Sequence, residues 1–167
     1  MIQIKNIGLI GFGVVGEGVY HVIHQTPGLQ VRIKKIGVKQ AHKNRNAPEN
    51  LFTTDLKTII DDPEIDTVVE LIDDADAAFE IVRQSITRGK NVVTANKKML
   101  AFHLTELIML QRKHKVSLLY EAAVCGSIPI LRNLEEYYNN DLLQSISGIV
   151  NGSTNFILTA MCDRQIP

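Results

Sequence analysis

The sequence predicts an α/β protein in which a doubly wound, mostly parallel sheet is covered by helices on both faces. Three observations lead to this prediction. Short β-branched runs alternate with helical patterns along most of the 167 residues. The strand-like runs are almost continuously apolar, which is typical of parallel strands buried on both faces. A glycine-rich turn joins the first run to the first helical pattern, and right-handed crossovers then wind such units into one sheet.

The N-terminal part contains one β-α-β unit. Residues 5–11, KNIGLIG, and residues 31–38, VRIKKIGV, predict strands because both are rich in β-branched residues. Residues 14–25, VVGEGVYHVIHQ, lie between them and predict a helix. Residues 39–50 are polar, contain one proline and show no period, so we expect a loop there.

The same alternation continues through the middle of the chain. Residues 66–72 predict a third strand, and residues 91–96 predict a fourth. Helices are expected after each of them, at residues 77–88 and 100–115, because apolar side chains recur at helical spacing. Residues 116–124, VSLLYEAAV, predict a fifth strand.

The pattern changes after Pro129. Residues 130–140 predict a helix, residues 142–150 a strand, and residues 153–162 the beginning of another helix. We therefore expect two domains. Residues 1–128 would form a dinucleotide-binding domain, and residues 129–167 would begin a dimerisation and substrate domain.

Composition excludes several classes of partner. Lysine and arginine total 18 and aspartate and glutamate total 18, so nothing suggests nucleic acid or an anionic membrane. No apolar run approaches the roughly 20 residues that span a bilayer. A strand pattern begins at the N-terminus, so we expect no signal peptide. Two cysteines, Cys125 and Cys162, favour a reduced, cytoplasmic protein over a disulfide scaffold.

The glycine-rich turn has the spacing GxGxxG. Gly11, Gly13 and Gly16 follow a predicted strand and open a predicted helix. In that position Gly11 permits a tight turn, Gly13 lets backbone approach a pyrophosphate, and Gly16 lets helix and strand pack closely. The helix N-terminus supplies N–H donors and positive dipole to the phosphates. The alternative is a purely structural turn.

The end of the second strand bears on the choice of cofactor. A site for NAD usually carries Asp or Glu there to bind the ribose 2′-hydroxyl. The residue after Val38 is instead Lys39, followed by Lys43 and Arg45, and such cations suit the 2′-phosphate of NADP. NADP is therefore favoured, and NAD stays open because these residues could equally be solvated loop charges.

Three later motifs are more specific than the glycine loop. They are Thr94-Ala95-Asn96-Lys97-Lys98, residues 121–130 (EAAVCGSIPI) and residues 148–158 (GIVNGSTNFIL). Together with the GxGxxG, and in this order, they resemble homoserine dehydrogenase over essentially the whole chain. The resemblance implies a Rossmann-type domain and the NAD(P)H-dependent reduction of aspartate 4-semialdehyde to homoserine, in threonine and methionine biosynthesis. It also implies a homodimer.

The resemblance assigns residues to the cofactor and to catalysis. The cofactor-binding positions that it implies are Gly11, Phe12, Gly13, Val14, Val15, Gly16, Lys39, Thr94 and Lys97. Lys97 matches the lysine of the family's ANK motif, beside nicotinamide and substrate, and is the expected catalytic residue. A lysine at the carboxyl end of a parallel strand points into the ligand crevice, where it can stabilise or protonate a developing alkoxide.

The resemblance also implies a monovalent cation such as Na⁺. Glu121, Val124, Gly126 and Ile128 match a loop that binds the ion through one carboxylate and backbone carbonyls, which are the hard oxygen ligands that it prefers. The alternative is a structural turn in which the glutamate caps a helix.

Two features depart from the family pattern. Asp73 and Asp74 stand where the family usually has Gly-Gly, and we expect them either to weaken phosphate binding or to turn outward. The chain ends at Pro167, before the family's acidic substrate-binding residues and its second catalytic lysine. We therefore expect the 167 residues to contain the cofactor half and no complete active site.

Two other functions remain open on the sequence. One is a non-catalytic nucleotide-binding regulatory module, which the incomplete site would allow. The other is a different amino-acid dehydrogenase of the same architecture, which the ANKK and GIVNGSTNFIL motifs disfavour.

Overall fold

The computed structural model describes residues 4–40, 43–126, 128–149 and 151–165. The chain divides into two compact units, Met1–Tyr120 and Glu121–Pro167. The domain boundary predicted from the sequence, after residue 128, stays a prediction, because compact units need not coincide with domains that fold independently.

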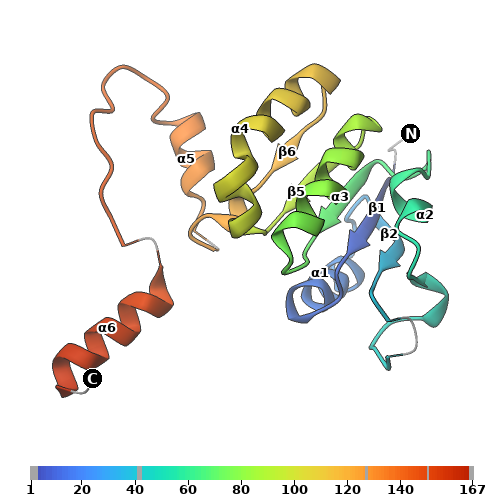
Figure 1. Cartoon of the computed structure of the whole chain (residues 1–167), viewed down its shortest axis with the longest axis horizontal. Coiled ribbons are helices and arrows are strands. Elements are labelled where there is room, and N and C mark those ends of the chain that lie inside the picture. Colours follow the sequence, from blue (N-terminus) through green and yellow to red (C-terminus); the bar gives the residue numbers. More distant parts are fainter. Residues whose placement is uncertain (1–3, 41–42, 127, 150, 166–167) are drawn as a thin grey trace. The chain divides into compact units, whose positions relative to one another are not determined.

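A parallel sheet forms the first unit (Figure 1). Its strands are β1 (Lys5–Ile10), β2 (Val31–Gly37), β3 (Phe52–Thr53), β4 (Thr67–Glu70), β5 (Asn91–Thr94) and β6 (Leu118–Leu119). The order across the sheet is β3-β2-β1-β4-β5-β6, and every pair is parallel. Strands β2 and β3 are added on one side of β1, and strands β4, β5 and β6 are added on its other side. The position between β1 and β4 is therefore the topological switch point, where doubly wound sheets bind ligands.

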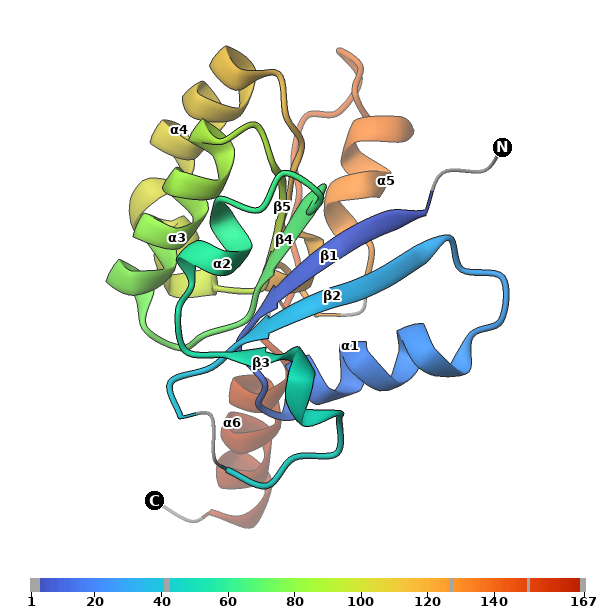
Figure 2. The same ribbon diagram turned by 90° about the vertical axis from the view of Figure 1, so that its right-hand side faces the viewer.

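Helices cover both faces of this sheet, as the sequence predicts. They are α1 (Val14–Gln25), α2 (Lys57–Ile60), α3 (Ala75–Thr87) and α4 (Lys97–His114). Figure 2 shows α1 on one face and α2, α3 and α4 on the other. No helix in the described ranges combines the length and the apolar character needed to cross a membrane.

The core lies in two layers because successive strand residues point to opposite faces. In β1, Leu9 packs with Tyr20 of α1, and its neighbour Ile10 packs with Ile59 of α2. In β4, Val68 and Val69 divide between the two layers in the same way. Burial of both faces explains why adjacent residues within these strands, such as Leu9 and Ile10 or Val68 and Val69, are all apolar.

Some short elements differ from the sequence prediction. The 3-10 turn η1 (Glu49–Leu51), β3 and α2 were not expected, because two to four residues are too few to show a period. The fifth predicted strand, residues 116–124, is reduced to β6 and is followed by the 3-10 turn η2 (Glu121–Ala123).

The second unit contains α5 (Ile130–Glu136) and α6 (Gly152–Arg164) (Figure 1). Both helices were predicted. The strand predicted at residues 142–150 is wrong for residues 142–149, which form no strand, and Val150 lies outside the described residues. A strand requires a hydrogen-bonded neighbour, and the described part of this unit contains no other strand.

Candidate functional site

The glycine loop joins β1 to α1 beside the switch point. Gly11 has a φ of +101°, and a Cβ on it would lie 2.6 Å from the carbonyl oxygen of Leu71. A Cβ on Gly16 would lie 2.3 Å from the carbonyl oxygen of Gly11. Only glycine fits at these two positions, since one needs a left-handed conformation and both need close backbone contact.

Gly13 has a different role. It is the N-cap of α1, and no side chain at this position forms a capping hydrogen bond. A Cβ on Gly13 would meet no atom of the protein within 4 Å. The next residue, Val14, is 91% exposed. The first amides of α1 therefore face open space, with the partial positive charge of a helix N-terminus behind them. This cradle fits the pyrophosphate of a dinucleotide.

A pocket of about 410 Å³ lies beside this helix N-terminus. Its lining comes from the glycine loop, the first turn of α1 and the loop after β2: Phe12, Gly13, Val14, Glu17, Lys43, Asn44, Arg45 and Asn46. Asn46 donates a hydrogen bond of 2.8 Å to Glu17 and so ties the loop to the helix. The cradle and the pocket are continuous, because Phe12, Gly13 and Val14 belong to both.

The cations expected to favour NADP differ in their surroundings. Arg45 donates to the carbonyl oxygens of Lys43 and Gln40, at 2.9 and 2.6 Å, and its guanidinium lies 5.1 Å from the ring centre of Phe52. Arg45 therefore holds the loop in shape. Lys39 is exposed just beyond β2, and Lys43 lines the pocket.

The aspartates that replace the family's Gly-Gly follow β4. Asp74 is the N-cap of α3, and its Oδ1 accepts hydrogen bonds from the N–H groups of Asp76 and Ala77 at 3.1 and 3.0 Å. Hydrogen bonding from Ala77, chiefly, holds the pKa of Asp74 below its usual value, and the charge of Lys39 acts in the same direction. The second aspartate thus has a structural use in this chain.

A buried polar cluster lies at the carboxyl ends of β4 and β5. Glu70 and Thr94 are fully buried, and the Thr94 hydroxyl donates a hydrogen bond of 2.6 Å to Glu70 Oε2. Burial raises the pKa of Glu70. Thr94 was predicted as a cofactor residue, and its hydroxyl is directed to Glu70. Glu70 was missed, although a carboxylate at the end of the apolar run TVVE was a signal that could have found it.

Lys97 is the first residue of α4, three residues earlier than the predicted helix start. Asn96 caps this helix, its Oδ1 accepting from the N–H of Met99 at 2.9 Å. Lys97 and Lys98 are both exposed. The turn places Lys97 directly after β5, at the same edge of the sheet as the glycine loop.

The predicted cation loop lies in the second unit. The carboxylate oxygens of Glu121 accept from the N–H groups of Leu131 and Arg132, at 3.0 and 3.2 Å, and so cap α5. The carbonyl of Ile128 accepts from the N–H of Ile130 at 2.8 Å. Two expected ligands are thus used within the fold, which agrees with the alternative of a capping glutamate. A cation at Glu121, Val124, Gly126 and Ile128 stays a prediction.

No group of three or more His, Cys, Asp or Glu in the described residues could hold a metal ion. Cys125 and Cys162 are both free.

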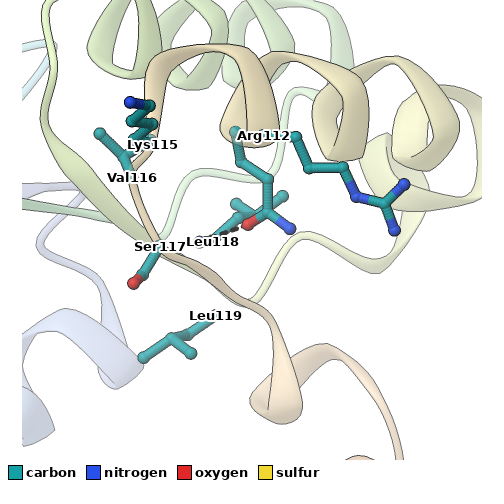
Figure 3. Close-up of a pocket in the computed structure, with 7 residues that line it drawn as sticks. Arg112, Lys115, Val116, Ser117, Leu118 and Leu119 are labelled. Carbon is teal, nitrogen blue, oxygen red and sulfur yellow. Dashed lines mark hydrogen bonds between the residues drawn. The ribbon is translucent and has the colours of Figure 1, made fainter.

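A second cavity, of about 400 Å³, lies where α4 passes into β6 (Figure 3). There Gln111 accepts a hydrogen bond from the N–H of Leu118 at 2.8 Å. This cavity is at the amino end of β6, so it is separate from the carboxyl-end site.

The fold and the site define a dinucleotide-binding α/β protein of the doubly wound class. Comparison with known proteins gives the family. Residues 11–121 match the family model of the homoserine dehydrogenase NAD binding domain, and residues 129–166 match that of homoserine dehydrogenase. The chain belongs to the homoserine dehydrogenase family, and its nucleotide-binding part is of the kind that takes a nicotinamide cofactor.

Relatives agree in sequence and in structure. The chain is 39% identical to the homoserine dehydrogenase of Bacillus subtilis, over 96% of this chain and 39% of that protein. It is 39% identical to that of Synechocystis sp., over 93% and 37%. The crystal structure of a homoserine dehydrogenase from Thiobacillus denitrificans superposes with a TM-score of 0.83 at 36% identity, over 96% and 39%. The chain thus spans about two fifths of the length of these relatives.

Proposed function

We propose that this chain is the cofactor-binding part of an NAD(P)-dependent homoserine dehydrogenase. Such an enzyme interconverts aspartate 4-semialdehyde and homoserine. The observation that carries the proposal is the open cradle at Gly13, where uncapped amides of α1 face a pocket of about 410 Å³. The family to which the chain belongs supplies the reaction.

Some residues of this chain would bind the cofactor, and Lys97 would take part in catalysis. The bound nicotinamide would supply the hydride that reduces the aldehyde carbon. The amides of Val14 and Val15 would hold the pyrophosphate. Lys97 would stabilise the substrate oxygen as it becomes charged and would donate a proton to it. Its place at the carboxyl end of β5 is where such a group can reach the crevice.

The finer choice of cofactor follows from charge. We expect NADPH to be preferred over NADH, because Lys39 and Lys43 offer cations beside the end of β2 and no carboxylate follows that strand directly. Assembly into a homodimer and a cytoplasmic location are likewise predictions.

We expect the activity to require residues in addition to these 167. Hydride transfer needs the aldehyde carbon held at near-attack distance, and that positioning supplies several kcal/mol of the barrier. We expect the 167-residue chain to bind NADPH and to show no reduction of aspartate 4-semialdehyde. Joined to the remaining part of the Bacillus subtilis relative, it should oxidise NADPH in the presence of the semialdehyde.

Lys97→Ala in the joined protein tests the catalytic role. It should lower kcat by about 100-fold or more while changing the KM for NADPH little, as expected for general acid catalysis. Lys98→Ala is the matched control and should retain activity. Turnover by the short chain would contradict the claim of an incomplete site. A joined protein that binds NADPH without turnover would favour a non-catalytic nucleotide-binding module.

A further inference from the structure

Glu70 belongs to a closed ring of hydrogen bonds between two turns. Its Oε1 accepts from the N–H of Ile72 at 2.7 Å, and its Oε2 accepts from the hydroxyl of Thr94 at 2.6 Å. Thr94 Oγ1 accepts from the N–H of Asn96 at 3.0 Å, and Asn96 Nδ2 donates to the carbonyl of Ile72 at 2.9 Å, which closes the ring. The turn after β4 and the turn after β5 are thereby connected.

The ring is buried at the edge where the ligand crevice lies. Glu70 and Thr94 are 0% exposed, and Asn96 is 7% exposed. One side of the ring touches the glycine loop, since Leu71 carbonyl and Ile72 Cγ2 are the nearest atoms to a Cβ placed on Gly11. The other side ends at Asn96, next to Lys97.

We propose that Glu70 is a positioning residue for the nicotinamide half of the cofactor site, because its carboxyl holds the turns after β4 and β5 together and so sets where Lys97 begins α4. This inference rests on the proposed function. In a doubly wound sheet the half that carries the glycine loop takes one mononucleotide, and the half built on β4, β5 and β6 takes the other. The ring lies in the second half.

The hydrogen-bond donors of the ring require a side chain at position 70 that accepts two hydrogen bonds. The N–H of Ile72 and the hydroxyl of Thr94 both point at the Glu70 carboxyl, and the N–H of Asn96 occupies the Thr94 oxygen as an acceptor. Glutamine would keep an acceptor for Ile72 but would present an N–H group to Thr94. The arrangement that satisfies all three donors therefore needs a carboxyl group. Burial favours neutral Glu70, while the hydrogen bonds from Thr94 and Ile72 favour the carboxylate.

The role differs from a general stabilising role in what it predicts for ligands. A ring that only stabilises the fold would affect every ligand alike when broken. A ring that positions the second half should affect the whole dinucleotide and spare a fragment that occupies the first half. Adenosine 2′,5′-bisphosphate is such a fragment of NADPH, because it lacks the nicotinamide mononucleotide.

The test uses the 167-residue chain and calorimetric titration with NADPH and with adenosine 2′,5′-bisphosphate. Thr94→Val removes the hydroxyl at nearly constant volume, and Thr94→Ser keeps it. Glu70→Gln alters the carboxyl, and Glu106→Gln is the matched control on the exposed part of α4. Circular dichroism establishes that each variant is folded, and if Glu70→Gln does not fold the two threonine variants decide.

We expect Thr94→Val and Glu70→Gln to weaken NADPH binding about tenfold, because binding must then restore the arrangement of the two turns that the lost hydrogen bond held. Their affinity for the bisphosphate should change by less than about twofold. Glu106→Gln should leave both affinities unchanged, and Thr94→Ser, which keeps the hydroxyl, should retain most of the NADPH affinity that Thr94→Val loses. Equal weakening for the two ligands, or unchanged NADPH affinity, would overturn the positioning role. A wild-type chain that binds neither ligand would instead overturn the proposed function, and this inference with it.

Discussion

Each of the three glycines in the β1–α1 loop is required for a different physical reason. Gly11 supplies a left-handed backbone conformation, and Gly16 removes a side chain that would collide with the loop's own carbonyl. Gly13 meets neither need, since its φ is −90° and the space beside it is open. Its lack of a side chain matters only if another molecule occupies that space, which is why it is the glycine that points to a ligand.

This distinction makes a prediction for Gly13 and Gly16. Gly13→Ala should leave the free energy of unfolding nearly unchanged and weaken NADPH binding by about tenfold or more, because the added methyl group occupies the place of the pyrophosphate. Gly16→Ala should destabilise the fold by about 1–3 kcal/mol through overpacking. Urea denaturation and NADPH titration of both variants measure this. Normal NADPH binding by Gly13→Ala would show that no ligand approaches there.

Lys39 supports a prediction about cofactor choice. In the wild-type chain NADPH should bind more tightly than NADH, and Lys39→Ala should reduce that preference by about three- to tenfold, the effect of one exposed charge–charge contact. Lys35→Ala, which changes another lysine of the same region, is the control. Titration with both cofactors at fixed ionic strength measures the ratio. A preference that survives Lys39→Ala would remove this residue from the 2′-phosphate site.

At the scale of elements, two of the helices that border the crevice begin at side-chain caps. Asp74 caps α3 and Asn96 caps α4, each through Oδ1. Among the helices that follow β1, β4 and β5, α1 at the glycine loop is the one that begins without a capping side chain. The first N–H groups of a capped helix are already hydrogen-bonded and cannot donate to a phosphate. An anion is therefore expected to bind at α1, whose first N–H groups have no capping side chain.

The Asp74 cap predicts a pH dependence of stability. Its pKa is lowered in the folded chain, so the charged cap stabilises the fold above the usual value of 3.8. That contribution should disappear as the pH falls through the lowered folded pKa. Asp74→Asn keeps the Oδ1 acceptor without the charge. Wild type should therefore melt at a higher temperature than Asp74→Asn at pH 7, and the difference should narrow as the pH falls below 3.8.

Asp73→Asn is the control for this effect, because that neighbouring exposed carboxylate is not the capping residue. Thermal melts followed by circular dichroism between about pH 3 and pH 7 give the comparison. A difference between wild type and Asp74→Asn that grows toward acid pH would contradict the assigned cap.

At the scale of the whole molecule, the two units differ in how they bury apolar side chains. In the first unit, buried side chains such as Leu9 and Val68 fill two layers around a sheet. In the second, the described residues include exposed apolar side chains at Leu142, Ile146 and Ile149. Such a concentration of exposed apolar surface is characteristic of an interaction site. It agrees with the expected homodimer, which stays a prediction.

The dimer prediction is tested by replacing an apolar residue of this segment. Ile146, which is 64% exposed, can be changed to glutamate without disturbing a core. We expect sedimentation equilibrium to show a dimer for wild type and a shift toward monomer for Ile146→Glu, because a charge is costly to bury at an interface. Ser147→Glu adds the same charge at the next residue and is the control. A monomeric wild-type chain would contradict the prediction.

The pattern of residues alone determined the fold class and most of the elements of the first unit. Long strands buried on both faces and a helix with a regular period are local signals, so β1, α1, β2 and α4 were predictable. The glycine loop was equally predictable, because its spacing reflects local geometry. The strand expected at residues 142–150 was wrong for residues 142–149, since strand formation depends on a partner that local sequence does not specify.

Only the tertiary structure decided which residues that are distant in the chain become hydrogen-bond partners. The sequence shows Glu70 and Thr94 as separate polar residues, and parallel pairing of β4 with β5 places them opposite each other. The sequence shows Asp74 as a departure from the family, and the fold makes it the cap of α3. Glu121 likewise becomes the cap of α5. Hydrogen-bond partners that are many residues apart are chosen by strand order and helix placement, and these are properties of the folded chain.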